Sequence, residues 1–159
     1  MKTPPSDSLR ERAYRLGLWG VLARWDELAE SPWLAELIAV EEDERQRRSL
    51  ERRIQNAKLK RFKPMVDFDW SWPTKIDRAL VEELFTLQFL EERANVVLVG
   101  PNSVGKTTIA KNLAHQALLR GHTVRCVSAS EMLNDLAAQD SAATLGNRIA
   151  RYCRPALLV

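Results

Sequence analysis

The sequence has few of the residues that build metal and disulfide sites. Its 159 residues include two cysteines and two histidines. Cys126 and Cys153 form no C-x-x-C pair, and His115 and His122 have no partners at ligand spacing, which argues against a metal site or a redox motif. We expect buried free thiols, as in proteins of a reducing cytoplasm, and histidines that are structural or solvent-facing.

Long apolar runs are absent as well. No stretch of about 18 apolar residues occurs, which excludes a transmembrane helix and predicts a protein without a membrane partner. Residues 1–7 lack the apolar core of a signal peptide, and we expect them to be disordered and the protein to be cytoplasmic. With 45% hydrophobic and 28% charged residues, the composition is that of a soluble globular protein.

Positive charge is concentrated in one segment. The net charge of the chain is +3, yet nine lysines and arginines stand against two glutamates between Glu44 and Lys63, so this segment carries +7 and the remainder −4. Such a run either contacts DNA phosphates or forms a solvated helix face. Nothing in it indicates base readout. The candidate DNA contacts are Arg45, Arg48, Arg52, Arg53, Lys58, Lys60 and Arg61.

The most informative motif runs from Gly100 to Thr107. Its sequence, GPNSVGKT, matches the phosphate-binding P-loop pattern G-x-x-x-x-G-K-[ST]. The apolar run 95–99 before it predicts a buried parallel strand, and the apolar spacing after it predicts a helix over 108–120 that Gly121 ends. Strand, glycine loop and helix in this order are the context that the motif needs.

The loop predicts ATP and Mg²⁺ as ligands. Gly100 and Gly105 let the backbone approach phosphate, at the positive end of the following helix. Lys106 is expected to reach the β- and γ-phosphates as the catalytic lysine, Thr107 to bind Mg²⁺, and Thr108 to support the loop or the α-phosphate. The predicted nucleotide-binding residues are Gly100, Pro101, Asn102, Ser103, Val104, Gly105, Lys106, Thr107 and Thr108.

Helices are predicted on the N-terminal side of the loop. Apolar spacing indicates one over 8–30, weakened at Gly17 and Gly20, and a second that starts at Ser31-Pro32 and runs to about residue 61 before Pro64 ends it. A third covers 77–92. Between the last two lies an aromatic strap, which we expect to be extended and to end at Pro73. The strap either packs on the core or stacks on adenine or a base, through Phe68, Trp70 and Trp72.

Beyond the loop the elements alternate. We predict a strand over 123–127, a helix that Ser130 caps and that ends near Ala138, a helix over 144–152 and a third strand over 156–159. The order β–loop–α–β–α–α–β is the start of a doubly wound parallel sheet. Three strands with two edges make only a small sheet.

These features together resemble the IstB-type ATP-binding helper proteins of insertion sequences, which are relatives of DnaC-type helicase loaders within the AAA+ ATPases. The resemblance rests on the basic run 56–63 (NAKLKRFK), the strap 66–72 (VDFDWSW) and the P-loop. Residues 76–78, 81–84, 121–124 and 130–133 are similar to the family's intervening segments. Residues 8–45 resemble its helical domain less specifically.

The resemblance implies a fold class and a domain plan. The expected fold is an α/β P-loop NTPase of the AAA+ type, a three-layer parallel sheet truncated after the third strand and preceded by an all-helical N-terminal domain. The expected domains are 1–63, helical with a basic DNA-binding helix end; 64–94, strap and linker helix; and 95–159, the N-terminal part of the ATP-binding domain.

Two departures from the family pattern bear on catalysis. The family usually has a glycine near Ser103. In the family, a strand like 157–159 leads into the Asp-Glu pair that holds Mg²⁺ and orients water, and we expect that pair, with strands four and five, beyond Val159. The expected consequences are nucleotide binding without hydrolysis by these 159 residues and an empty position between strand 95–99 and the other two.

The resemblance also implies a role in DNA transposition. In that role ATP drives self-assembly on DNA, and the assembly selects target sites and recruits a transposase. Two alternatives remain open from the residues alone. One is a DnaC-like loader that binds a replicative helicase in place of DNA, and the other is an inactive truncated remnant.

Overall fold

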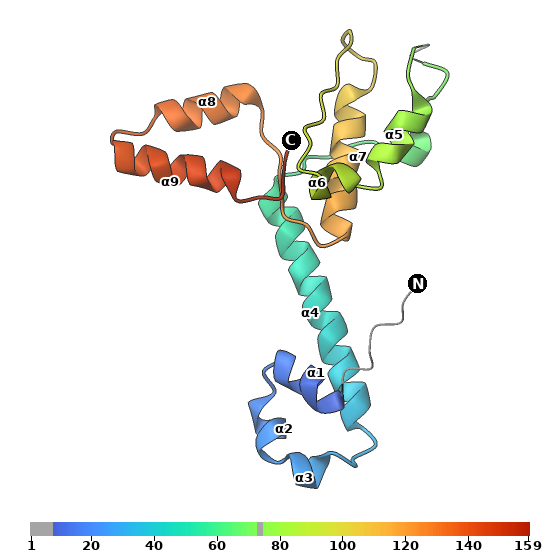
Figure 1. The fold of residues 1–159 in the computed structure, drawn as a ribbon, viewed down its shortest axis with the longest axis vertical. Coiled ribbons are helices and arrows are strands. Elements are labelled where there is room, and N and C mark those ends of the chain that lie inside the picture. The colour runs from blue at the N-terminus through green and yellow to red at the C-terminus, as the bar shows by residue number, and fades with distance from the viewer. Residues whose placement is uncertain (1–7, 73–74) are drawn as a thin grey trace. The chain divides into compact units, whose positions relative to one another are not determined.

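The computed structural model describes residues 8–72 and 75–159 (Figure 1). The predictions for residues 1–7 and for Pro73 lie outside the described residues. The contacts divide the chain into two compact units, Met1–Ser49 and Leu50–Val159. No helix in the described ranges is long and apolar enough to cross a membrane.

Short helices and the first part of a long one form the unit Met1–Ser49. They are α1 (Leu9–Arg15), α2 (Trp19–Ala23) and α3 (Trp25–Leu28). The helical pattern over 8–30 is therefore three helices. The break expected at Gly17 is present, since this residue has a φ of +65°, whereas Gly20 lies inside α2. The buried core of this unit consists of Ala13, Leu16, Leu34 and Ile38.

The long helix α4 (Leu34–Ala57) begins in the first unit and ends in the second. The prediction that it continues to residue 61 and ends at Pro64 was wrong. Lys58 has a φ of +53°, and the carbonyl oxygen of Ala57 accepts a hydrogen bond of 2.7 Å from the N–H of Cys126. A left-handed residue directly after the last turn is a common helix end. Residues 58–63 therefore lie outside the helix.

The P-loop helix α7 (Lys106–Leu119) carries the core of the unit Leu50–Val159. The helix ends just before Gly121, which has a φ of +92°, as predicted. The helix buries one apolar side along its whole length, and the residues of that side are Ile109, Leu113, Ala114, Ala117 and Leu118. Val81, Leu87, Val124 and the α4 end at Ala57 pack against it.

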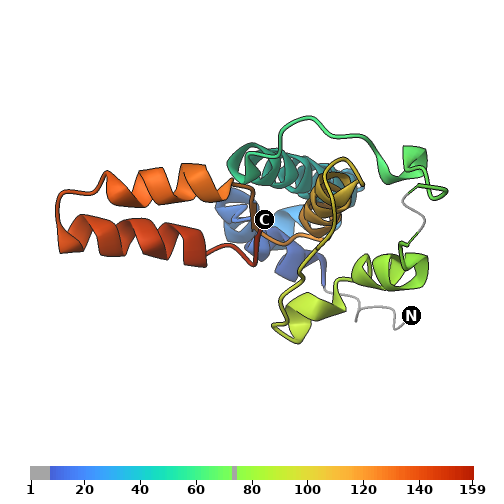
Figure 2. The ribbon, with the colours of Figure 1, turned by 90° about the horizontal axis from the view of Figure 1, so that it is seen from above.

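Two strands follow α7 and pair in parallel. In β1 (Val124–Arg125) and β2 (Leu157–Leu158), Val124 lies opposite Leu157 and Arg125 opposite Leu158. Between them α8 (Ala129–Ala137) and α9 (Ala142–Cys153) lie side by side as a hairpin, which Figures 1 and 2 show from two directions. The predicted cap of α8 was wrong by two residues, since Ser128 and not Ser130 accepts the N–H of Glu131.

The predicted first strand, 95–99, is not part of the sheet. No backbone hydrogen bond of this segment is present within the described ranges, and Val97 and Val99 are 78% and 90% exposed. A buried strand needs neighbours on both sides, and here a cavity of about 400 Å³ lies between the segment and β2. The cavity walls include Val96, Leu98, Leu113, Leu157 and Leu158.

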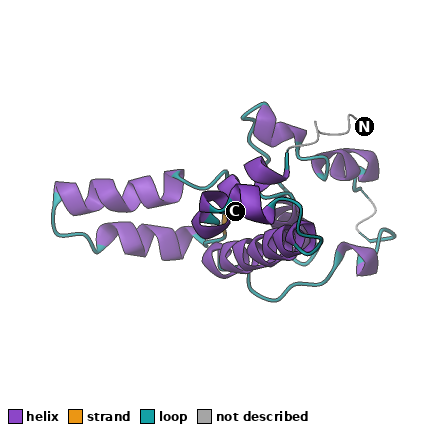
Figure 3. Ribbon diagram, turned by 90° about the horizontal axis from the view of Figure 1, so that it is seen from below, coloured by secondary structure: helices purple, strands orange, loops and turns teal. Residues whose placement is uncertain are grey.

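Helix therefore dominates the described residues, with one small parallel sheet (Figure 3). This is consistent with a truncated α/β fold, in which the strand expected before α7 is not formed. The three-layer sheet remains a prediction, and so do the domain boundaries at residues 63 and 94.

The linker region differs from its prediction in two places. The helix predicted over 77–92 consists of α5 (Arg78–Leu84) and α6 (Gln88–Glu91), separated by Leu87 at a φ of +65°. The aromatic strap contains a 3₁₀ turn, η1 (Met65–Asp67), and is not a strand. Leu87 is buried, so burial in the core and not local preference sets this break.

The thiols differ from one another. Cys126 is half-buried, and burial raises its pKa. Cys153 lies exposed at the end of α9, so the prediction of a buried thiol was wrong there. His115 is half-buried against the ring of Phe62, at 5.5 Å between centroids.

Candidate nucleotide-binding site

The loop before α7 enters the helix through a left-handed glycine. Gly105 is the N-cap of α7, with φ +92° and ψ 3°. The first amides of a helix have no partner within the helix, and they form its positive end. In Figure 1 the chain from 95 to 105 runs past α7 and turns back into the start of that helix.

Lys106 lies across this loop. Its Nζ donates a hydrogen bond of 2.7 Å to the carbonyl oxygen of Gly100 and another to that of Pro101. The lysine charge is thus held over the loop by two neutral acceptors, which phosphate oxygens would replace as stronger, charged acceptors. Gly100 itself is not crowded by protein, because an added Cβ would lie 3.5 Å from Val104. Its glycine leaves room on the ligand side.

Ser103 occupies a position that favours glycine. Its φ is +65°, in the left-handed region where a non-glycine residue is uncommon. The departure from the family pattern noted at this residue therefore has a structural counterpart. The loop forms the left-handed bend in spite of the serine side chain.

A cavity of about 480 Å³ opens beside the loop. Lys106 and Thr107 line it, and so do lysines from two other segments, Lys58 and Lys60 after α4 and Lys111 within α7. Its size lies in the range of small-molecule sites. Two residues that sequence reasoning placed at DNA, Lys58 and Lys60, thus lie beside the predicted nucleotide loop, and Lys111 was missed because one lysine on a helix gives no pattern.

The lining of the cavity is apolar in part and includes a carboxylate. Leu98, Ala110 and Val159 contribute apolar lining, and Glu131 is the one acidic side chain among the described residues of the lining. Lys60 Nζ is 3.7 Å from Glu131, and Ser128 holds the same carboxylate through backbone and hydroxyl hydrogen bonds that lower its pKa. The Glu131 carboxylate therefore already accepts hydrogen bonds from Ser128 at the start of α8 and forms an ion pair with Lys60.

Thr107 is the predicted magnesium ligand. It is exposed and lines the cavity next to Lys106. Mg²⁺ in nucleotide sites takes few protein ligands and several phosphate or water oxygens. No group of three or more histidine, cysteine or acidic side chains within the described ranges is arranged to hold a metal. Binding of Mg²⁺ by Thr107 remains a prediction.

The aromatic strap packs on the core, next to the loop. The sequence had left open whether its rings pack on the core or stack on adenine or a base. Phe68 and Trp70 are partly buried on the core of the second unit, while Trp72 is 62% exposed. The Phe68 ring is so close to Gly105 that an added Cβ there would lie 2.5 Å from its Cε2 atom. Packing is therefore the observed state of Phe68 and Trp70, and Trp72 keeps an open face.

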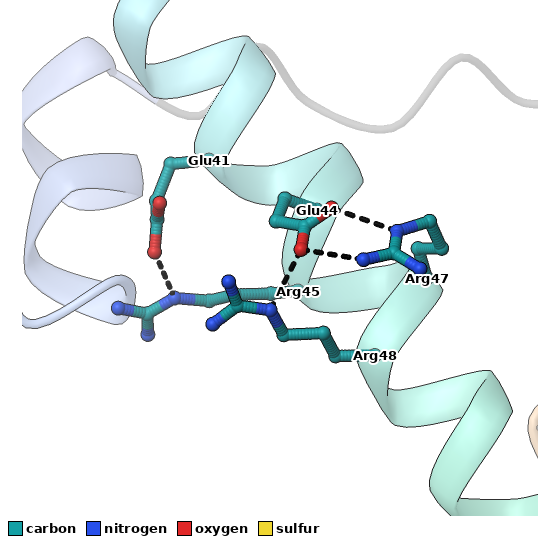
Figure 4. Close-up of polar contacts among 5 residues, drawn as sticks. All are labelled: Glu41, Glu44, Arg45, Arg47 and Arg48. Carbon is teal, nitrogen blue, oxygen red and sulfur yellow. Dashed lines mark hydrogen bonds and ion pairs between the residues drawn. The ribbon is translucent and has the colours of Figure 1, made fainter.

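The basic segment divides into arginines that form ion pairs with glutamates of α4 and residues that lie in the second unit. In the first unit, Arg45 is 2.7 Å from a Glu41 oxygen, and both Arg47 and Arg48 contact Glu44, at 2.8 and 2.7 Å. Figure 4 shows Glu44 between its two arginines. These contacts hold the pKa of Glu44 at about 2, first through the hydrogen bond from Arg47 and then through that from Arg48. Arg45 and Arg48 thus already face carboxylates.

The remaining predicted DNA contacts lie in the second unit. Arg52, Lys58, Lys60 and Arg61 are exposed, whereas Arg53 is half-buried with its Nη2 3.5 Å from the carbonyl oxygen of Leu118. The structure therefore does not present the seven side chains as one equivalent set. Contact with DNA remains a prediction for each of them.

Comparison with known proteins gives one family. Residues 21–159 match the family model described as IstB-like ATP binding protein. A relative named for ATP binding in insertion sequence IS5376 of Geobacillus stearothermophilus is 28% identical, with 96% of this chain and 64% of the relative aligned. A relative named for ATP binding in an insertion sequence of Mycobacterium tuberculosis is 37% identical, with 77% of this chain and 50% of the relative aligned.

A third relative agrees with these two. It is named for ATP binding in insertion sequence IS21 of Pseudomonas aeruginosa and is 41% identical over 50% of this chain and 30% of its own length. The chain thus spans less than two thirds of the length of these curated relatives.

Proposed function

The chain belongs to the family of IstB-like ATP-binding proteins, and from this premise we propose that its Gly100–Thr108 loop binds Mg-ATP in support of DNA transposition. The observation that carries the proposal is the position of Lys106. Its ammonium group lies over the loop, held by the carbonyls of Gly100 and Pro101, next to the amides at the start of α7. Anions bind where such amides and a cation converge.

The proposed roles follow from this geometry. Lys106 exchanges its carbonyl acceptors for the β- and γ-phosphate oxygens, and the loop amides bind the β-phosphate. Thr107 supplies one hydroxyl to Mg²⁺, which the phosphates hold. Thr108, half-buried in the first turn of α7, supports the loop.

The proposed biological role is assistance to a transposase. The relatives from Geobacillus, Mycobacterium and Pseudomonas are each named for an insertion sequence, which supports transposition over helicase loading. In this proposal the full-length protein self-assembles on DNA with ATP, selects target sites and recruits the transposase. The exposed Arg52, Lys58 and Arg61 contribute phosphate contacts without base readout.

A nucleotide titration tests the site. We expect the wild-type chain to bind Mg-ATP and Lys106→Ala to lose roughly 30- to 150-fold in affinity, as the loss of a charged hydrogen bond of about 2–3 kcal/mol implies. Lys75→Ala, at an exposed lysine that does not line the cavity beside the loop, is the control and keeps wild-type affinity. Equal affinities of the wild type and Lys106→Ala contradict the site.

A salt titration tests the DNA contacts. Binding of a duplex weakens with salt in proportion to the phosphates contacted. Arg52→Ala is expected to reduce the slope of log K against log salt by about 1, as one lost phosphate contact implies. Arg93→Ala, at an exposed arginine outside the basic segment, leaves the slope unchanged. Duplex binding that does not depend on salt contradicts phosphate contact.

A further inference from the structure

We propose that Phe68 is a positioning residue of the nucleotide loop, an inference that rests on the proposed function. The strap residue lies 37 positions before Gly105 in the chain, yet its ring covers that glycine. An added Cβ at Gly105 would meet Cε2 of Phe68 at 2.5 Å and Cζ at 2.9 Å. Gly105 is therefore required twice, by its φ of +92° and by the ring packed against it.

The Phe68 ring also contacts a second aromatic ring of the strap. Phe68 and Trp70 meet edge to face with centroids 4.9 Å apart, a favoured aromatic geometry. The guanidinium of Arg78 lies 4.8 Å from the Trp70 ring centre, and Glu82 holds that guanidinium at 2.7 Å. A chain of contacts thus runs from α5 through Trp70 and Phe68 to Gly105.

The chain just before the strap is fastened to α7. Asn112 is buried and donates a hydrogen bond to the carbonyl of Lys63 at 2.9 Å, besides one within α7 to the carbonyl of Thr108 at 2.8 Å. Lys111 Nζ donates to the carbonyl of Arg61 at 3.2 Å. Both donors belong to the helix that follows the P-loop. The start of the strap, a few residues before Phe68, is therefore tied to the same helix as the loop.

The position of Gly105 decides what the site can do. It is the residue directly before Lys106, and its conformation sets the direction of the first amides of α7. A loop that is held in the binding geometry loses less entropy on binding phosphate than one that must be ordered first. Phe68 contacts no ligand in this proposal and acts through Gly105. Trp70 and Gly105 already contact the ring, which favours packing over stacking on a base as its role.

The basic run 56–63, which precedes the strap, offers a matched control. Phe62 packs on α7 against His115, ten residues along the chain from Gly105. Phe62→Leu therefore removes an aromatic contact between this run and α7 without touching the loop. The two leucine variants should lose similar stability, because each replaces one partly buried ring.

The experiment compares Mg-ATP affinity and melting temperature for wild type, Phe68→Leu, Phe68→Ala and Phe62→Leu. We expect Phe62→Leu to bind as the wild type does, Phe68→Leu to bind a few-fold more weakly and Phe68→Ala about tenfold more weakly, the loss of about 1.4 kcal/mol of loop ordering. Equal affinities of Phe68→Leu and Phe62→Leu, at equal melting temperatures, overturn the inference and leave the proposed function intact.

Fluorescence supplies a readout that mere packing would not move. Because Trp70 contacts Phe68, settling of the loop on the nucleotide is expected to change the Trp70 emission. The emission change on adding Mg-ATP is recorded for the wild type and for Trp70→Phe, and the second is subtracted from the first. Trp72→Phe serves as the control and keeps the difference. A spectrum that Trp70→Phe leaves unaltered counts against coupling of strap and loop.

A thermal double-mutant cycle separates this inference from the proposed function. Gly105→Ala in the wild type meets both the Phe68 ring and the positive φ, whereas in Phe68→Ala it meets the φ alone. The fall in melting temperature caused by Gly105→Ala should therefore be smaller in the Phe68→Ala background. Equal falls contradict the contact, whatever the nucleotide titration shows. A wild-type chain that binds no Mg-ATP overturns the proposed function and, with it, the positioning role.

Discussion

Ser103 stores strain at the centre of the nucleotide loop. Its φ of +65° places an L-residue in the left-handed region, which costs roughly 1–2 kcal/mol. Strain of this kind is retained only where the surrounding structure enforces it. Here the loop must bend between Gly100 and Gly105, and the residue at the bend has a Cβ. A glycine would remove the strain and add backbone entropy to the unfolded chain.

Ser103→Gly is accordingly expected to stabilise the folded chain. The relief of roughly 1–2 kcal/mol exceeds the backbone entropy cost of roughly 0.5–1 kcal/mol, so the net gain in the free energy of unfolding is about 0.5 kcal/mol. Urea unfolding measures it. Ser130→Gly, inside α8, is the control, and it is expected to lower the free energy of unfolding by about 0.5 kcal/mol. A destabilised Ser103→Gly contradicts the strain.

Glu44 predicts a pH dependence of stability. Its pKa is lowered from 4.5 to about 2 in the folded chain by the hydrogen bonds from Arg47 and Arg48. A depressed carboxylate pKa contributes stability that is present above pH 4.5 and is lost as the pH falls towards 2. In Glu44→Gln this part of the acid dependence disappears, and the melting temperatures of the variant and the wild type converge near pH 2.

Melting curves between pH 6 and pH 2 measure this. Glu36→Gln, on an exposed glutamate of the same helix, keeps the wild-type dependence and controls for helix propensity. A melting temperature of Glu44→Gln that falls with pH as steeply as that of the wild type contradicts the role of Glu44. The same variant leaves Arg47 and Arg48 facing a neutral amide, which favours their contact with phosphate.

At the scale of the element, the start of α8 shows how a sheet sets a helix boundary. Sequence reasoning chose Ser130 as the cap, and the structure uses Ser128, which forms a capping box with Glu131. The N–H of Val127 donates to the carbonyl of Val159 at 2.8 Å. That bond keeps the chain extended up to Val127, so Ser128 is the first residue that is able to leave the sheet.

Replacing the two serines separates these alternatives. Ser128→Ala is expected to lose about 1 kcal/mol of unfolding free energy, the usual cost of a lost N-cap. Ser130→Ala, inside the helix, is expected to be neutral or slightly stabilising, because alanine is the better helix former. Urea denaturation of both variants measures the difference. A larger loss for Ser130→Ala contradicts the cap assignment.

At the scale of the molecule, the division into two compact units predicts that nucleotide binding affects amide exchange in one unit only. The P-loop, the strap and α7 all belong to Leu50–Val159, and Asn112 and Lys111 tie the chain just before the strap to α7. Mg-ATP is therefore expected to slow amide exchange in the first turns of α7 and in residues 60–72. Exchange in α1, α2 and α3 stays unchanged.

Hydrogen exchange with mass spectrometry measures the response peptide by peptide. Lys106→Ala is the matched control, since it keeps the fold and removes the ligand's main charged contact. Protection of α1–α3 by Mg-ATP as strong as that of α7 contradicts an independent response of the two units.

The features that sequence predicted well are local. The apolar spacing located α7, and Gly121 marked its end, since these depend on a few adjacent residues. The failures arise from distant contacts. Leu87 breaks a helix because the core buries it, Ala57 ends α4 where Cys126 takes its carbonyl, and 95–99 stays unpaired for want of strands beside it.

The sequence by itself determined the family and the concentration of basic charge, and it carries the proposal of a nucleotide loop, because backbone conformation and phosphate chemistry depend on residue type over short spans. Only the tertiary structure decided which side chains surround the loop. Phe68 over Gly105, Asn112 at the carbonyl of Lys63 and the lysines 58, 60 and 111 beside Lys106 come together through packing across the fold. No spacing in the sequence records such contacts, because they are set by which apolar faces bury one another.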